Sequence, residues 1–468
     1  MRLLHYIERR AKKLVDLSDA IWNLAEVGLH ENQSAELLAS FLESEGFSVK
    51  RGVSGMPSAF VAEYGKGKPV IAILGEYDAL PGLSQKVGVT KEPARRGAAG
   101  HGCGHNLLGV AAAGAAAAVK EAMDGGALQG TVRFYGCPAE ETLVGKVFMV
   151  RDGLFADVDI ALTWHPGSLN SLWAGSSLSL NSVKFRFHGR TAHAAGDPHS
   201  GRSALDAVEL MNVAANYLRE HVVPEARIHY VITNGGGEPN IVPGEAEVWY
   251  YVRAPLRKQV DEIYGRLLKI AEGACLMTET SFETEFLAAC YNTLHNNVLG
   301  DLLMDKLNEV GAPQFTPEDY EFAAQMTESF PAGIEASRKF LKDQGLPYEG
   351  KVLCDFIIPP HDLGKVSSGS TDVGDVSHVV PTAQFTAASN VLGTPGHSWQ
   401  YTAACGMNIG HQGMLTAAKV LALSTVELLQ NDSLIQEAWD LFRKQKEGDP
   451  YVSPLPEGAE PPLHQLKH

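Results

Sequence analysis

Thiol, imidazole and carboxylate side chains occur in the first part of the sequence at positions where they could bind a metal ion. Cys103 and His105 lie in a stretch with glycine at 100, 102 and 104, directly before an alanine-rich run. These glycines remove side-chain bulk and free the backbone, so both side chains can face the same small object. A thiolate and an imidazole, joined by Glu141 and His165, form a nitrogen, oxygen and sulfur set that suits a transition-metal dication. Each residue alone would be assigned to the core, but together they predict a metal site.

Two adjacent carboxylates, Glu140 and Glu141, suggest a second kind of chemistry. Adjacent glutamates usually form a solvated charge run. Here they follow Cys-Pro-Ala after an apolar segment, where solvated charges would be out of place. Because neighbouring side chains point in different directions, one carboxylate can bind a metal while the other stays free beside a bound water. The free carboxylate is a candidate general base.

The elements that must position these side chains alternate between strands and helices. We predict helices over 4–25, 34–42 and 106–123, and strands over 59–64, 70–74, 131–135 and 159–164. Asn106 is placed to cap the third helix. Strands separated by helices indicate a largely parallel sheet covered on both faces. Asp78, the glutamate pair and His165 each follow or end a strand, and the carboxyl ends of the strands form the ligand crevice of such a sheet, so these groups should converge.

A different pattern starts near Ser179, with the order strand, helix, strand, strand, helix, strand. The segments are 183–187, 203–221, 227–232, 246–252, 260–275 and 282–286. This order is the ferredoxin-like arrangement, a compact two-layer unit that can fold by itself. The predicted fold class is therefore α/β, a mainly parallel sheet flanked by helices, with an inserted ferredoxin-like α+β domain. We place the inserted domain at 179–290 and the two parts of the first domain at 1–178 and 291–468.

The last part of the chain is expected to be mostly helical. We predict helices over 297–310, 318–340, 413–429 and from there to about 446, with a loop-rich stretch over 351–374. The tail at 449–468 contains five prolines. We expect this tail to be extended, and either to wrap the surface or to be disordered.

Composition excludes several classes of partner. The sequence has 39 Lys and Arg against 55 Asp and Glu, a formal net charge of -16, which disfavours nucleic acid and anionic membranes. The apolar stretch from Leu107 to Val119 has 13 residues, short of the roughly 20 that a bilayer requires, so no membrane span is expected. The chain begins without an apolar signal segment, and its six cysteines are scattered. We therefore expect reduced thiols and a cytoplasmic protein.

The motifs resemble those of the family 20 metallopeptidases, zinc- or manganese-dependent enzymes that include aminoacylases, carboxypeptidases and auxin-conjugate amidohydrolases. The matching motifs, in family order, are Asp-Ala-Leu-Pro at 78–81, Gly-Cys-Gly-His at 102–105, Pro-Ala-Glu-Glu at 138–141, His165, Thr-Ala-His-Ala-Ala at 191–195, Asn-Ile-Val-Pro at 240–243 with Arg253, and Gly-Thr-Pro-Gly-His at 393–397. Motifs in this order over most of a chain are a specific signal. Longer matches, among them Gly-His-Gly-Cys-Gly-His-Asn-Leu-Leu-Gly at 100–109 and Ser-Thr-Asp-Val-Gly-Asp-Val-Ser at 370–377, are similar to the aminobenzoyl-glutamate hydrolase branch of the family.

The resemblance implies a site for two divalent metal ions, manganese or zinc. The implied ligands are Cys103, His105, Glu141, His165 and His397. Glu140 would be the general base, and Asp78 would orient a ligand histidine, as such second partners generally do. Some relatives carry a histidine where this chain has Glu76, and we leave Glu76 out of the ligand set.

The resemblance also implies a substrate and an assembly. His193 would reach the scissile carbonyl, from the same or a partner subunit, while Asn240 and Arg253 would hold the substrate's carboxylate. The planar fork of an arginine suits bidentate binding of a carboxylate. The substrate is expected to be a small amide with a free carboxylate, and the inserted domain is expected to act as a lid and to join homologous subunits into a homodimer or a heteromer.

The expected reaction is hydrolysis of the amide bond of an N-acyl amino acid or a dipeptide-like substrate, such as p-aminobenzoyl-glutamate. One alternative is a non-catalytic or incomplete binding subunit that needs a homologous partner, although the ligand set and Glu140 are complete. A second alternative has Cys103 as a covalent nucleophile and His105 as its base. The two residues are close together on a glycine-rich turn with no evident oxyanion loop, which disfavours this alternative.

Overall fold

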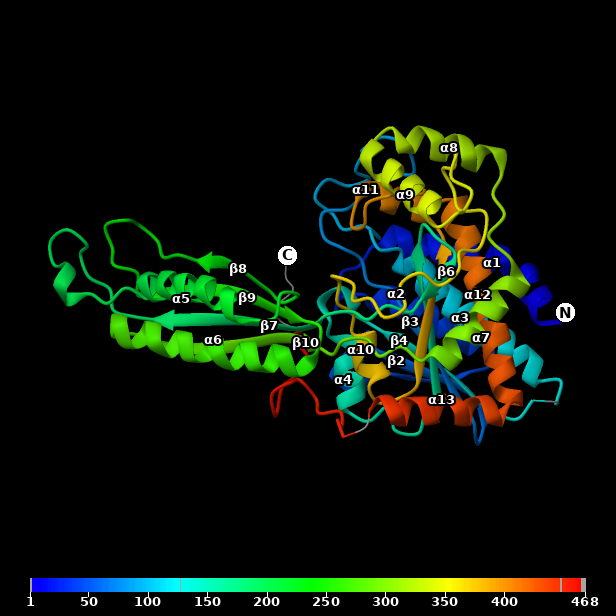
Figure 1. The fold of residues 1–468 in the computed structure, drawn as a ribbon, viewed down its shortest axis with the longest axis horizontal. Coiled ribbons are helices and arrows are strands. Elements are labelled where there is room, and N and C mark those ends of the chain that lie inside the picture. The colour runs from blue at the N-terminus through cyan, green and yellow to red at the C-terminus, as the bar shows by residue number, and fades with distance from the viewer. Residues whose placement is uncertain (1, 127, 447, 464–468) are drawn as a thin grey trace.

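The computed structural model describes residues 2–126, 128–446 and 448–463, and it contains two sheets (Figure 1). The main sheet has seven strands in the order β1-β2-β4-β3-β5-β11-β6. The strands are β1 (Ser48–Arg51), β2 (Phe60–Lys66), β3 (Val70–Glu76), β4 (Gly130–Cys137), β5 (Ile160–Gly167), β6 (Ser171–Trp173) and β11 (Thr382–Ala388).

The main sheet is parallel only at its centre. The pairs β4/β3, β3/β5 and β5/β11 are parallel, whereas β1/β2, β2/β4 and β11/β6 are antiparallel. Parallel neighbours need a crossover of about a dozen residues or more, which the short connection between β1 and β2 does not provide. The α/β fold class is confirmed, with a mixed rather than a mainly parallel sheet.

Helices cover both faces of the main sheet. The longer helices of this part of the chain are α1 (Arg2–Leu24), α2 (Asn32–Ser44), α3 (His105–Met123), α7 (Asn297–Val310), α12 (Asn408–Gln430) and α13 (Asp432–Gln445). The alanine-rich α3 is buried along almost its whole length and packs against α1, α12 and the central strands, because its small side chains allow close approach. The short helices α4 (Gly145–Arg151) and α10 (Val373–Ser377) contact each other, and Val147 and Val376 belong to the core that also contains Leu74 of β3.

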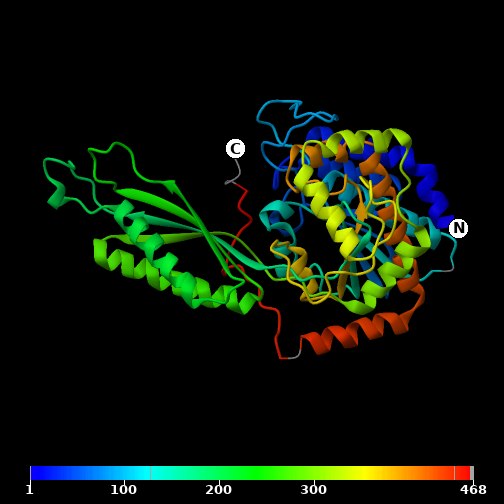
Figure 2. The ribbon, with the colours of Figure 1, turned by 45° about the horizontal axis from the view of Figure 1, so that its top comes forward.

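The second sheet and its two helices form what we call the outer lobe, which projects away from the main sheet (Figures 1 and 2). Its elements are β7 (Ser179–His188), α5 (Ala204–Leu218), β8 (Arg227–Asn234), β9 (Glu245–Ala254), α6 (Arg257–Thr278) and β10 (Ser281–Cys290). The antiparallel order is β10-β7-β9-β8, with α5 and α6 packed on one face around Phe185 and Tyr250. The predicted ferredoxin-like arrangement is confirmed.

Two local predictions were wrong. The helix predicted over 318–340 is two helices, α8 (Pro317–Thr327) and α9 (Pro331–Asp343), because a proline favours the first turn of a new helix and disrupts a helix interior. Asn106 does not cap α3, which begins at His105 after Gly104 with a left-handed φ of 77°. The Asn106 amide instead donates to the Ser18 hydroxyl and to the Cys405 carbonyl.

The described part of the proline-rich tail, 449–463, lies against the main body of the protein. The Tyr451 hydroxyl donates to Asp375 Oδ1 at 2.9 Å, and the Tyr291 hydroxyl donates to the Val452 carbonyl at 3.0 Å. The Ala459 carbonyl accepts from Arg151 Nη1, so the tail follows the surface as far as residue 459, and its last five residues lie outside the described part. Among the described helices, including α11 (Trp399–Cys405), none is long and apolar enough to span a membrane.

Candidate metal centre and active site

The predicted ligands come from four separate segments that meet at one edge of the main sheet. Cys103 precedes α3 and His105 is its first residue. Glu141 lies in a single 3-10 turn (Glu140–Thr142) after β4, His165 lies in β5, and His397 lies in the loop between β11 and α11. The convergence predicted from the strand ends is therefore present in the structure.

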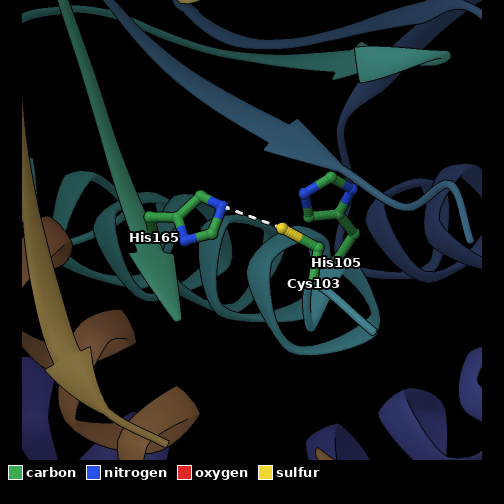
Figure 3. Close-up of side chains that lie close together, drawn as sticks. All are labelled: Cys103, His105 and His165. Carbon is green, nitrogen blue, oxygen red and sulfur yellow. Dashed lines mark hydrogen bonds between the residues drawn. The ribbon is translucent and has the colours of Figure 1, made fainter. Parts of the chain in front are cut away.

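A first group of potential ligands consists of Cys103, His105 and His165, whose ligand atoms all lie within 4.8 Å of one another (Figure 3). Cys103 Sγ is 3.4 Å from His165 Nε2. His105 Nδ1 is 2.8 Å from Asp78 Oδ1, and His165 Nδ1 is 2.7 Å from the Pro166 carbonyl. With Nδ1 of each ring donating to these oxygens, both Nε2 atoms present a lone pair toward the group.

A second group consists of Cys103, Glu141 and His397, again with all ligand atoms within 4.8 Å. Glu141 Oε2 is 3.5 Å from His397 Nε2. The backbone N–H of Glu141 donates to Asp78 Oδ2 at 2.9 Å, so Asp78 contacts both groups. His397 has a φ of 51°, which is uncommon for a residue other than glycine and often occurs at functional sites. The five predicted ligands thus form two overlapping groups that share Cys103.

Glu140 and Glu76 form a third group with His105. His105 Nε2 is 3.4 Å from Glu76 Oε2 and 3.9 Å from Glu140 Oε2. Glu140 is buried, so the predicted general base lies next to the first ligand group in a protected position. Glu76, which the motifs left outside the ligand set, is as close to His105 as the assigned ligands are to one another.

The electrostatics of the site fit a bound cation. Burial raises the pKa of Glu141 to about 7 and lowers the pKa of His165 to about 4. Burial and the neighbouring Glu141 also hold the pKa of the Cys103 thiol well above its usual value. Glu76 Oε2, Glu141 Oε1 and His105 Nε2 are buried and have no hydrogen-bond partner among the described residues. A divalent metal would satisfy these acceptors. It would also stabilise the Cys103 thiolate, because burial without a nearby cation disfavours the charged form of a thiol.

A cavity of about 300 Å³ opens beside these groups. Trp173 and Tyr251 contribute aromatic surface to it, and the rings of Trp173 and His165 meet edge to face at 5.3 Å. Arg253 also lines the cavity, from the end of β9 nearest the main sheet. Its Nη1 donates to the Ser368 carbonyl at 3.5 Å, and its Nε has no partner within the described residues. Arg253 is therefore placed to bind a ligand that enters the cavity.

His193 lies in the loop after β7 and Asn240 in the loop between β8 and β9. These loops are at the end of the outer lobe that is far from the main sheet (Figures 1 and 2). The two loops contact each other, with the Ala194 N–H donating to the Asn240 carbonyl at 2.8 Å. Strand β7 pairs with β9 from Ser179 at the near end to His188 at the far end. At about 3.3 Å per residue, the ten residues of β7 place these ends roughly 30 Å apart. The structure of one chain therefore does not bring His193 and Asn240 to the metal ligands.

Sequence comparison relates the chain to known peptidases and amide hydrolases. Residues 177–276 match the peptidase dimerisation domain of the M20 family. The chain is 44% identical to one of the p-aminobenzoyl-glutamate hydrolase subunits of Escherichia coli, over 97% of each chain. It is 28% identical to the Xaa-Arg dipeptidase of Homo sapiens, over 97% of this chain and 94% of that protein.

Solved structures show the same fold. The aminobenzoyl-glutamate utilization protein from Klebsiella pneumoniae matches with a TM-score of 0.63 at 18% identity, covering 92% of this chain and 98% of that one. A dinuclear metal binding peptidase of the M20 family from Bacillus subtilis matches with a TM-score of 0.59 at 15% identity, covering 90% and 99%. The family predicted from the motifs is confirmed. The identity to the Escherichia coli protein over nearly the whole length of both chains shows that this chain belongs to the M20 peptidases, a family of hydrolases that act on amide bonds.

Proposed function

We propose that this protein hydrolyses the amide bond of an N-acyl amino acid or dipeptide-like substrate, p-aminobenzoyl-glutamate among them, and releases the free amino acid. The observation that carries the proposal is the pair of ligand groups that share Cys103, with the buried Glu140 beside them. The name of the Escherichia coli relative supports the choice of substrate.

Two divalent ions, manganese or zinc, would be held by Cys103 with His105 and His165, and by Cys103 with Glu141 and His397. When bound, such ions acidify a water molecule and polarise an amide carbonyl. A mixed set of thiolate, imidazole and carboxylate ligands accepts either metal. Asp78 supports both positions, because one of its oxygens contacts His105 Nδ1 and the other accepts from the backbone of Glu141.

Glu140 carries the proton in this proposal. Burial and the neighbouring Glu76 raise the pKa of its carboxyl well above the usual value, which makes the carboxylate a stronger base. Glu140 takes a proton from the attacking water and then donates it to the nitrogen of the leaving amine. The 3-10 turn that contains it also contains Glu141, so the base and one ligand are fixed relative to each other.

The substrate is held on the outer-lobe side of the cavity. Arg253 binds the carboxylate of the substrate through its guanidinium, whose Nε has no partner among the residues that the structure describes. Trp173 and Tyr251 line the same cavity and offer flat apolar surface to an acyl group such as an aromatic ring.

His193 and Asn240 complete the site from a partner chain. The outer lobe has an open edge at β8, where Val231 and Ile232 are exposed, and Val213 and Tyr217 are exposed on α5. Exposed apolar residues on an edge strand favour pairing with another chain. The partner is a second copy or a homologous protein. A relative from Haemophilus influenzae, 24% identical over 49% of this chain, is named as a homologue of a different p-aminobenzoyl-glutamate hydrolase subunit, which supports a heteromer as the second case.

A cytoplasmic location is part of the same proposal. All six cysteines lie in the described part of the chain and are free thiols. A protein of this length with no disulfide among six cysteines fits a reducing compartment.

The test is metal removal and return on the purified chain. Dialysis against a chelator should abolish hydrolysis of p-aminobenzoyl-glutamate, and manganese or zinc should restore it. No hydrolysis at any metal load, with a panel of N-acyl amino acids and dipeptides, would favour the incomplete binding protein. Activity that persists after complete removal of metal would favour Cys103 as a nucleophile.

A further inference from the structure

A buried lysine contacts two buried carboxylates next to the ligand groups. Lys146, at the start of α4, is fully buried, and its ammonium lies 2.7 Å from Glu76 Oε1. The same ammonium contacts Asp372 Oδ1, and the backbone N–H of Lys146 donates to Asp372 Oδ2 at 2.8 Å. Glu76 and Asp372 are also buried. One oxygen of Glu76 is therefore fixed by a charged contact that no solvent competes with.

The other oxygen of Glu76 faces the ring nitrogen Nε2 of His105. Glu76 Oε2 lies 3.4 Å from His105 Nε2, and neither atom has a hydrogen-bond partner in the described part of the chain. Because His105 Nδ1 donates to Asp78, Nε2 of the neutral ring is an acceptor, as Oε2 is. Two buried acceptors that face each other require a cation between them, either a second proton on the His105 ring or a bound metal ion.

The spacing of these atoms suits shared coordination. Metal bonds of about 2.1 Å to nitrogen and oxygen, in a tetrahedral arrangement, place the two ligand atoms about 3.4 Å apart. The observed separation of Glu76 Oε2 and His105 Nε2 is 3.4 Å. Glu76 groups with His105 in this way but not with Glu141 and His397. Glu76 thus distinguishes one metal position from the other.

We propose that Glu76 is a further ligand of the metal bound by His105, and that Lys146, held by Asp372, is a positioning residue that aims the free oxygen of Glu76 at this metal. The inference rests on the proposed two-metal site and adds a residue outside the five ligands. It predicts that the metal position at His105 is the tighter of the two, because Glu76 gives it a fourth protein ligand, whereas the position at His397 has three.

The sign of the effect of Lys146 separates positioning from simple neutralisation. If Lys146 only reduced the negative charge near the site, its removal would strengthen metal binding. If Lys146 aims Glu76, its removal weakens binding at the His105 position. Removal of Lys146 from a protein that already lacks the Glu76 charge then has no further effect, because the lysine acts through that carboxylate.

The experiment is equilibrium dialysis of the full chain against buffered free zinc, with bound zinc counted by elemental analysis. Glu76→Gln keeps an oxygen for Lys146 but removes the charge, and we expect the tighter zinc affinity to fall by about 100-fold while the weaker one stays within about twofold. Lys146→Met should lower the same affinity by about 10-fold or more. The double variant should match Glu76→Gln, and His397→Ala should lose the other zinc.

Asp375→Asn is the matched control, since Asp375 is a buried carboxyl in the neighbouring α10 that touches none of the ligands, and it should keep both affinities. Thermal unfolding of each variant establishes that it is folded, and Lys146→Gln, which is also neutral, serves if Lys146→Met does not fold. Unchanged affinities in Glu76→Gln would overturn the ligand assignment, and tighter binding in Lys146→Met or in Lys146→Gln would overturn the positioning role. A wild-type chain that binds fewer than two zinc ions would contradict the two-metal proposal itself.

Discussion

The metal centre and the far end of the outer lobe differ in almost every physical respect, although the resemblance assigns catalytic work to both. Around Cys103 and His105 the side chains are largely buried, and their imidazoles are oriented by second partners. His193 and Asn240 are exposed in loops beyond the far end of β7, and that end is roughly 20 Å from Ser182, the last β7 residue that lines the cavity. His193 Nδ1 accepts only local backbone N–H groups, from Ala195 and Gly196.

The difference shows which part of the site folding alone can build. A buried cluster is fixed when the main sheet forms, because four segments meet at its edge and close around it. An exposed loop gains a function only when another surface meets it. On this view one chain supplies the metal site, its base and Arg253, and assembly supplies the groups that contact the substrate carbonyl.

Glu140→Gln should give the largest effect, because it removes the proton carrier from the buried region and leaves the far loops intact. We expect kcat to fall by about 100-fold or more, while bound metal is unchanged. Steady-state kinetics with metal analysis on the same sample checks this. Glu141→Gln is the comparison, since it should also reduce metal content. Turnover close to wild type in Glu140→Gln would mean that another group moves the proton.

His193→Ala tests the other region and should reduce kcat by about 100-fold, with metal binding unchanged. A mixture of His193→Ala and Glu140→Gln chains then tests whether the two regions meet between subunits. In a randomly mixed homodimer half of the dimers are mixed, and one of their two sites is intact, so activity should return to about a quarter of the wild-type level.

Mixing His193→Ala with Asn240→Ala chains is the matched control. Both residues would come from the same protomer, so neither kind of site in a mixed dimer would be complete, and no recovery is expected. If the first mixture also fails to recover although mass analysis shows mixed dimers, His193 does not act across the interface in the way proposed.

The sequence predicted most of the metal centre, because its residues follow strands whose carboxyl ends must converge. It predicted the parallel strands β3, β4 and β5 from their apolar runs, and missed β11 and the short β1 and β6. Lys146 could not be predicted as a buried residue, since a lysine near a helix start usually faces solvent. Glu76 was excluded by comparison with relatives, and its closeness to His105 arises only in the folded structure. The separation of His193 from the cavity depends on the direction in which the outer lobe projects, which periodicity does not encode.

Arg253→Lys sharpens the comparison at the near end of the outer lobe, where a residue of this lobe does reach the cavity. Lysine keeps the charge but loses the planar fork, so we expect KM to rise by about 30-fold with a smaller change in kcat. For substrates that lack the free carboxylate, KM should be the same in wild type and in Arg253→Lys. Arg186→Lys, on the same sheet but away from the cavity, should leave KM unchanged. An unchanged KM in Arg253→Lys would mean that Arg253 does not bind the carboxylate of the substrate.

Asp375→Asn gives the smallest effect and concerns how the near end of the lobe is held. Asp375 accepts hydrogen bonds from the Tyr291 backbone and the Tyr451 hydroxyl, and burial raises its pKa to about 7. The folded state therefore holds this proton more tightly than the unfolded chain, where a carboxyl has a pKa of about 3.9. Its contribution to stability is present at low pH and is lost as pH rises toward 7 and above.

From pH 6 to pH 8, wild type should lose about 1.4 kcal/mol more of its free energy of unfolding than Asp375→Asn, which cannot release a proton. Urea denaturation at several pH values measures this difference. Asp301→Asn, at an exposed position on α7, should follow the wild-type slope. Parallel slopes for wild type and Asp375→Asn would mean that Asp375 is ionised throughout. The hydrogen bonds from Tyr291 and Tyr451 would then stabilise a carboxylate rather than a neutral carboxyl group. In that case the near end of the outer lobe, like the metal centre, would contain a buried carboxylate.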